Sequence, residues 1–425
     1  MGGREMNKKS RCFHVLSLAL GLLPSFVFAY VGTDPLPKGV RAAAFVYGYG
    51  KGIDSNLNSQ GRLESIVQPL NRSVSIQDIS AGQPELQKLI KILNEFEPGL
   101  GEQLLHADLA ASIQVNETRY VTGLMWGVTD RFSLGAIVPI IHRNVGVNFD
   151  ASVVNNAEAI AKRMGDVPQI QQGLQEVRNA KIDTAAFSDS IFTSRGYNSL
   201  APLDTSGLGD LELESRYTYY SDRWLGLALR ARVQVPTSSQ RPDLRNILDR
   251  EISEGNWALK AASIHEVKMI PGVLSWSSSV WGIWRSPVQR TMAFARTNDQ
   301  PLPDLNDPYQ IETVKRQYGS QLDVDTGLQF SLWRGVVSFT GSYQYTVHAQ
   351  DMVYGQRELD YGRWMANTNS ETHGVELIAE ISSIPLFLSK AFPLPAKVSV
   401  TWSQPFAGRN TVYTPYGRVD VVLLF

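Results

Sequence analysis

The chain has 425 residues, of which 43% are hydrophobic, 10% aromatic and only 19% charged, with a formal net charge of −1. This composition excludes a disordered chain and a nucleic-acid-binding protein with a basic surface, and a single cysteine excludes a scaffold held by disulfides. No linker rich in Gly, Ser or Pro divides the chain, so its length predicts one large architecture.

The first residues predict export. Four basic residues precede an apolar run over residues 15–28, which is followed by Ala29. This is the pattern of a secretory signal peptide, so we expect residues 1–29 to be removed. The mature chain then lacks cysteine, because Cys12 lies before the cut, and its formal charge is −4.

The remaining chain has the pattern of strands. No later stretch reaches about 18 uncharged apolar residues, which excludes a helical membrane span. Apolar and polar residues instead alternate in runs of about ten, as in strands with one apolar and one polar face. The clearest strand pairs are 210–235 and 322–347; fainter pairs occupy 110–145 and 256–285, and single strands lie near 38–50, 373–383, 395–406 and 411–425.

These runs predict an all-β fold, a transmembrane antiparallel β-barrel of about 12 strands over residues 30–425. An even number of strands puts both termini on one side, which we expect to be the periplasm of a bacterium with an outer membrane. The last strand ends at Phe425, as in closing strands that the barrel assembly machinery recognises. Aromatic residues beside the short turns predict a girdle in contact with outer-membrane lipid: Trp126, Phe132, Tyr219, Tyr220, Trp224, Phe330 and Trp333.

Long connections are expected on the extracellular side, and two of them, 51–106 and 147–206, contain helical patterns. One pattern covers residues 153–164. The other places five apolar residues on one helix face, namely Leu86, Leu89, Ile90, Leu93 and Phe96. These helices either cap the surface or form a lid or access site that touches a solute.

The polar faces of the strands carry both acidic and basic residues, which are candidates for the lumen. Facing carboxylates and guanidiniums either pair and brace the wall or line a polar path for a solute. Neither sign dominates, so a strongly ion-selective pore is not indicated. The candidates are Asp210, Glu212, Glu214, Arg216, Arg230, Arg232, Asp323, Asp325, Glu376, Arg418 and Asp420.

Enzymatic and cofactor chemistry find little support. The nearest nucleophile and base are Ser370 and His373, which lie in a predicted loop and lack the compact motif of barrel lipases. No metal-ligand spacing or phosphate-cradling glycine loop occurs, and the basic residues form no nucleic-acid stripe. We therefore predict no catalytic residues, no metal and no cofactor.

Two segments carry a family resemblance. Residues 122–134, TGLMWGVTDRFSL, end a strand in a Gly-x-Thr-Asp-Arg turn and lead to Pro139; residues 206–211, SGLGDL, open a strand whose partner ends in Val-Pro-Thr at 235–237. On these motifs the chain resembles the family of outer-membrane proteins of the meta-pathway of phenol degradation. The resemblance implies an outer-membrane channel that admits aromatic or other hydrophobic small molecules.

The sequence thus predicts a channel for passive uptake of small hydrophobic or aromatic solutes. The alternative is a closed structural or surface-interaction barrel whose large loops bind a partner. A continuous water path past Arg230, Arg232, Glu212 and Asp323 distinguishes the two.

Overall fold

The computed structural model describes residues 33–67, 72–76, 84–165, 167–179, 192–238, 241–297, 300 and 302–425. The predicted signal peptide lies outside the described residues. None of the helices within these ranges is long and apolar enough to cross a membrane.

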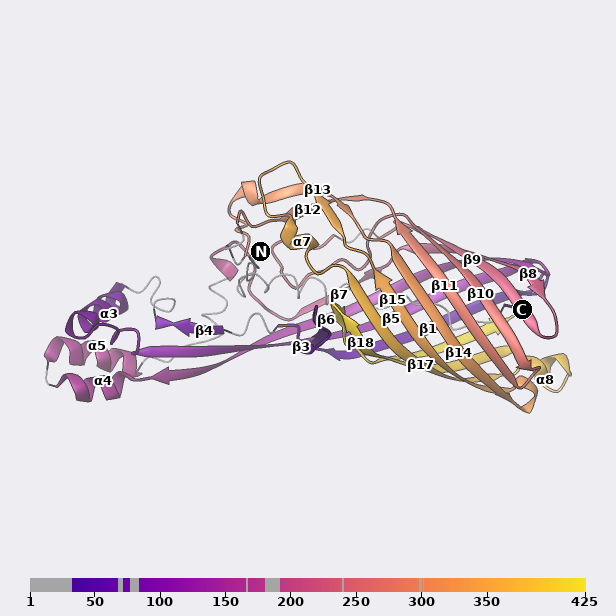
Figure 1. Ribbon diagram of the computed structural model, residues 1–425, viewed down its shortest axis with the longest axis horizontal. Helices are drawn as coiled ribbons and strands as arrows, with labels where there is room; N and C mark the ends of the chain where they lie inside the picture. The colour runs from indigo at the N-terminus through magenta and orange to yellow at the C-terminus, as the bar shows by residue number, and fades with distance from the viewer. Residues whose placement is uncertain are drawn as a thin grey trace, which may run out of the picture.

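Antiparallel strands close into a 12-strand β-barrel (Figure 1), which confirms the predicted fold class. The ring closes because β1 pairs with both β20 and β5, and β5 pairs with β6. The strands are β1 (Arg41–Ile53), β5 (Leu105–Thr129), β6 (Phe132–Asn155), β8 (Leu211–Ser221), β9 (Leu225–Val235), β10 (Ala258–Ile270), β11 (Leu274–Arg285), β14 (Gln321–Leu332), β15 (Val337–His348), β17 (Ser370–Ser382), β18 (Ala396–Arg409) and β20 (Tyr416–Leu424).

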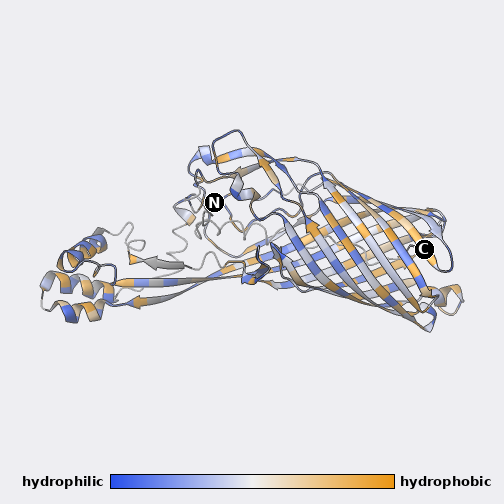
Figure 2. Cartoon of the chain, viewed as in Figure 1, coloured by the Kyte–Doolittle hydropathy of each residue, from blue (hydrophilic) through white to orange (hydrophobic). Residues whose placement is uncertain are grey.

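The strands place apolar side chains outside and polar ones inside, as the alternation predicts. In β9, Arg230 and Arg232 are buried in the lumen, whereas Leu229 is 50% exposed on the outer face. Successive residues of a strand point to opposite sides, so one register assigns every residue of a strand to a face. The alternating colours along the strands in Figure 2 follow from this pattern.

The two ends of the barrel differ. At one end, backbone hydrogen bonds of 2.8 and 2.9 Å join Arg41 to Phe425, and short turns connect the strands. We call this end the terminal end. The helix α8 (Ile384–Leu388) lies in the longest of these turns. At the opposite, loop end, small sheets cover the opening: β12 (Val288–Ala293), β13 (Ile311–Gln317) and β16 (Met352–Tyr354), and β2 (Ser55–Leu57), β3 (Leu63–Ser65) and β19 (Thr411–Val412).

The strands β5 and β6 extend past the barrel as a two-stranded arm (Figure 1). Their pairing is unbroken from Leu105 opposite Asn155 to Gly127 opposite Ser133, so residues 147–155, expected in a loop, continue β6. At the tip, α3 (Pro84–Phe96), α4 (Ala157–Met164) and α5 (Pro168–Asn179) pack around one apolar cluster. The short strands β4 (Arg72–Ser75) and β7 (Leu203–Leu208) pair with β5 and β6.

Candidate functional site

Three charged side chains meet inside the barrel where β8 and β9 pair. Glu214 accepts hydrogen bonds of 2.7 Å from Nε and Nη2 of Arg230 and one of 2.6 Å from Nε of Arg232. Only 3% of the Glu214 surface is exposed. Bidentate guanidinium–carboxylate pairs are the stronger kind of ion pair, and here they join two neighbouring strands.

Two further strands contribute to this central ion cluster. Glu212 of β8 accepts a hydrogen bond of 3.2 Å from Nη1 of Arg232 and forms an ion pair with Lys260 of β10. The guanidinium carbons of Arg230 and Arg232 lie 5.3 and 5.5 Å from the ring centroid of Trp281, a buried residue of β11. Cation–π contact therefore extends the cluster along the wall over four neighbouring strands, from β8 to β11.

The other predicted lumen residues form a second group on β14, β17 and β20, in which Asp325 lies close enough to Glu376, and Glu376 to Asp420, for their charges to interact. Asp420 accepts hydrogen bonds from Arg418 Nε at 3.1 Å and from Ser399 Oγ at 2.9 Å. Four strands along the wall from β20, Asp323 of β14 accepts a hydrogen bond from Gln321 at 2.8 Å. Nearby in that wall, Asp325 accepts a hydrogen bond of 3.3 Å from Ser279 Oγ, and Glu376 is opposite Ser342 and Ser403 in the sheet register.

Asp210 organises the loop end of β8 and does not belong to the central ion cluster. Its carboxylate accepts hydrogen bonds of 3.0 Å from Gln234 Nε2 and the Ser238 backbone and one of 3.1 Å from the Gly255 backbone. These contacts hold the connection between β9 and β10 over the lumen.

A second ion cluster lies where the arm leaves the barrel, and the sequence analysis missed it. Glu117 of β5 pairs with Arg119 of the same strand and accepts a hydrogen bond of 2.9 Å from Arg143 Nε of β6. Glu117 and Arg143 are buried. The signal was present, since charged residues recur at alternate positions there, but the fainter pattern of this strand pair concealed it.

The segment of residues 33–39 crosses the inside of the barrel at the terminal end. Thr33 Oγ1 donates a hydrogen bond of 2.8 Å to Glu266 of β10, and the Leu36 backbone donates one of 3.0 Å to Ser133 Oγ of β6. Arg216 Nη1 donates to the Asp34 carbonyl at 3.3 Å. The predicted lumen residue Arg216 therefore helps to anchor this segment.

A chamber of about 420 Å³, named here the terminal-end chamber, remains beside this segment. Its lining is mostly apolar and includes Leu36, Ala44, Phe387 and Leu424. Three of its four carboxylates, those of Glu214, Glu380 and Asp420, form ion pairs with Arg230, Lys397 and Arg418, and the fourth is that of Asp34. The chamber thus offers apolar surface beside these three ion pairs.

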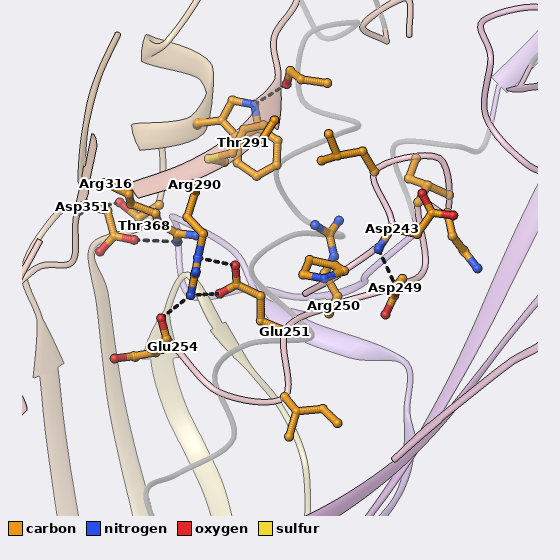
Figure 3. Close-up of a pocket in the computed structure, with 18 of the residues that line it drawn as sticks. Asp243, Asp249, Arg250, Glu251, Glu254, Arg290, Thr291, Arg316, Asp351 and Thr368 are labelled. Carbon is orange, nitrogen blue, oxygen red and sulfur yellow. Dashed lines mark hydrogen bonds and ion pairs between the residues drawn. The ribbon is translucent and has the colours of Figure 1, made fainter. Parts of the chain in front are cut away.

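The loops enclose another cavity of about 260 Å³, named here the loop-end cavity (Figure 3). It shares no lining residue with the terminal-end chamber. Burial raises the pKa of Glu251 although Arg290 Nε lies 2.6 Å from its carboxylate. Six arginines line it: Arg119, Arg143, Arg250, Arg290, Arg316 and Arg363.

The five candidate lid residues lie in α3 at the tip of the arm. Leu89, Ile90 and Leu93 are buried in the tip cluster, Leu86 packs against it, and Phe96 is 59% exposed. None of the five lines the terminal-end chamber or the loop-end cavity. Leu86, Leu89, Ile90 and Leu93 therefore pack in the tip, and the role of this helix as a lid or access site stays a prediction.

The sequence candidates for catalysis do not meet. Ser370 is buried at the start of β17, and His373, three positions later, interacts with Tyr343 OH at 2.6 Å and Glu371 at 3.3 Å. An odd separation within a strand puts two side chains on opposite faces. Within the described ranges, no group of three or more His, Cys, Asp or Glu side chains is placed to hold a metal ion.

Comparison with solved structures supports the barrel fold. The crystal structure of the COG4313 outer membrane channel from Pseudomonas putida F1 aligns with a TM-score of 0.50 and 13% identity, over 94% of this chain and all of that one. At this identity the likeness shows a common fold alone.

Two other solved structures align less closely. The transport unit of the autotransporter AIDA-I from Escherichia coli has a TM-score of 0.39 and 8% identity, over 98% of this chain and 99% of that one. The Pseudomonas putida toluene transporter TodX has a TM-score of 0.32 and 10% identity, over 93% and 92%. No protein-family model and no curated protein matches the chain, so the resemblance to the meta-pathway family stays a prediction.

Proposed function

We propose that the protein is an outer-membrane channel through which small hydrophobic or aromatic solutes diffuse passively. The observation that carries this proposal is the terminal-end chamber, an apolar space of about 420 Å³ inside a barrel with an apolar outer face. A closed barrel is one of two backbone arrangements that leave no unpaired peptide groups in lipid.

The lengths of the connections support one orientation of the barrel in the membrane. Outer-membrane barrels carry short turns on the periplasmic side and long loops outside. We therefore assign the terminal end to the periplasm and the loop end to the exterior, in line with the expectation that both termini are periplasmic. Phe425, 65% exposed at the end of β20, is the expected contact for the barrel assembly machinery.

The chamber suits a small apolar solute in size and in charge. Ligand pockets range over about 300–1,000 Å³ and are mostly apolar with few polar groups. The paired carboxylates do not require a charged ligand. The Pseudomonas putida structure with the same fold is itself named an outer membrane channel, which supports the assignment.

The test is single-channel conductance of residues 30–425 refolded into a planar bilayer, with toluene or phenol added on one side. We expect stable ion steps that the solute blocks. Ala44→Phe fills part of the chamber and should lower both conductance and block, because Ala44 lines it. Ala43→Phe, on the opposite face of the same strand, is the matched control and should change neither.

A closed structural barrel is the rival, and a specific observation favours it. The central ion cluster and residues 33–39 both occupy the lumen, and Arg232 is among the largest fully buried side chains. Absence of conductance from demonstrably folded protein, with no solute uptake into vesicles, would favour this reading and refute the channel.

A further inference from the structure

The outer face of the barrel carries an ionisable side chain where β10 pairs with β11, which lie side by side in Figure 1. Lys260 and Glu266 of β10 make their contacts inside the lumen, so Ser263 and His265, at the odd positions of the same strand, point outward. Ser278 of β11 lies directly opposite His265 and therefore shares this face of the sheet. We call Ser263, His265 and Ser278 the outer patch.

The outer patch lies at the height of the wall that contacts acyl chains. On β11, Ser278 lies between Trp276 and Trp284, and aromatic residues mark the two edges of the apolar band in an outer-membrane barrel. The outward residues around the patch are exposed and apolar, namely Leu229, Leu259 and Val280. An ionisable residue at this depth is rare and marks a functional site, because the hydrocarbon solvates it poorly.

The hydrogen-bonding capacity of the outer patch is only partly used. Ser263 Oγ and His265 Nε2 lie 3.0 Å apart and share a hydrogen bond. Among the described residues, no hydrogen bond reaches His265 Nδ1 or the hydroxyl of Ser278. By contrast, the neighbouring Trp276 Nε1 donates to Thr326 Oγ1 at 3.0 Å on the same face. Acyl chains offer neither donors nor acceptors, so each unused polar group of the patch costs free energy in lipid.

The polar groups of the outer patch are complementary to themselves. A neutral imidazole donates from one nitrogen and accepts at the other, and a serine hydroxyl does both. A second patch related by a two-fold axis therefore brings donors of one copy to acceptors of the other. Ala261 and Gly282 lie beside the patch in the two strands, and small residues let two membrane-embedded surfaces approach closely.

We propose that the outer patch is the contact between two copies of this chain in the membrane, with β10 and β11 of one barrel facing β10 and β11 of the other. Apolar contact alone does not drive association in lipid, because acyl chains are as apolar as leucine. The hydrogen bonds of His265 and Ser278 therefore decide which part of the wall is buried. This interface goes beyond the proposed channel function and does not depend on it, because it requires only that the barrel spans a membrane.

The test uses the mature chain, residues 30–425, which contains no cysteine, in phospholipid vesicles over a range of protein-to-lipid ratios. Val280→Cys places one thiol beside the outer patch, and Val419→Cys places one on β20, on the opposite wall of the ring. The two valines match in exposure, at 39% and 38%. We expect a short bifunctional maleimide to cross-link Val280→Cys into dimers at least fivefold more efficiently than Val419→Cys.

A second substitution in the Val280→Cys chain tests the polar groups themselves. His265→Leu should raise the apparent dissociation constant of the dimer at least tenfold, because a two-fold interface loses both copies of each hydrogen bond. Leucine suits a lipid-facing position, so this variant should fold. Thr122→Leu is the matched control, because it replaces another exposed polar residue of the outer face, on β5, and should leave the dissociation constant within twofold.

A chain that stays monomeric at every protein-to-lipid ratio would overturn the proposal, because lipid would then cover the outer patch. Equal cross-linking of the two thiols, or an unchanged dissociation constant in His265→Leu, would overturn it as well. Conductance bears on the channel alone. A dimer that does not conduct refutes only the channel, and a monomer that conducts refutes only this interface.

Discussion

Replacing Glu214 by glutamine removes the negative charge between two buried guanidinium groups and keeps the size of the side chain. Glu214 accepts three hydrogen bonds of 2.6–2.7 Å from Arg230 and Arg232, and all three residues are buried. Removing one partner of a buried ion pair costs about 3–5 kcal/mol, because the other charge stays buried without compensation. Arg232 keeps Glu212 as a partner, so we expect a loss of about 3 kcal/mol, at the lower end of that range.

The assay is urea unfolding of the mature barrel in phospholipid vesicles, followed by tryptophan fluorescence. Glu358→Gln, at an exposed loop position, is the control and should shift the free energy of unfolding by less than about 0.5 kcal/mol. The double variant Glu214→Gln, Arg230→Gln should lose less than the sum of its single variants, with a coupling of about 1 kcal/mol or more. A loss below about 1 kcal/mol for Glu214→Gln, or additive single effects, would refute the reasoning.

Two other predictions concern the segments at either end of the molecule. Gly127→Ala should displace residues 33–39, because a Cβ at residue 127 would collide with the carbonyl oxygens of Leu36 and Pro37. We expect faster trypsin cleavage at Lys38 and a larger conductance. Gly417→Ala is the control and should match the unmodified protein, because the atom nearest to its added Cβ would be 3.9 Å away. Leu93 is fully buried in the tip cluster, so Leu93→Ala should destabilise the tip by about 2–5 kcal/mol. Faster proteolysis of the arm measures this loss. An equal loss of thermal stability in the barrel would contradict the expectation that tip and barrel unfold independently.

The alternating pattern predicted which side chains face the lumen better than it predicted the groups that these side chains contact. The alternation of odd and even positions along β8 and β9 correctly separated the buried Glu214 and Arg230 from the exposed Leu213 and Leu229. The same argument grouped Asp210 with them, yet this carboxylate binds backbone groups of a loop. This alternation gives the face of the sheet to which a side chain points. The hydrogen-bond partner of that side chain depends on the strand register and on which loop folds over the strand.

The sequence by itself determined the closed barrel, its inside-out polarity and the helix at residues 84–96, because local periodicity records which side chains share a face. Only the tertiary structure decided that this helix packs at the tip of an arm, that residues 33–39 enter the lumen, and that six arginines gather around one cavity among the loops. These contacts join segments far apart in the chain, and they form only once closure of the sheet has brought their strands and loops together. Periodicity carries no information about such distances, so the barrel was predictable and its two cavities were not.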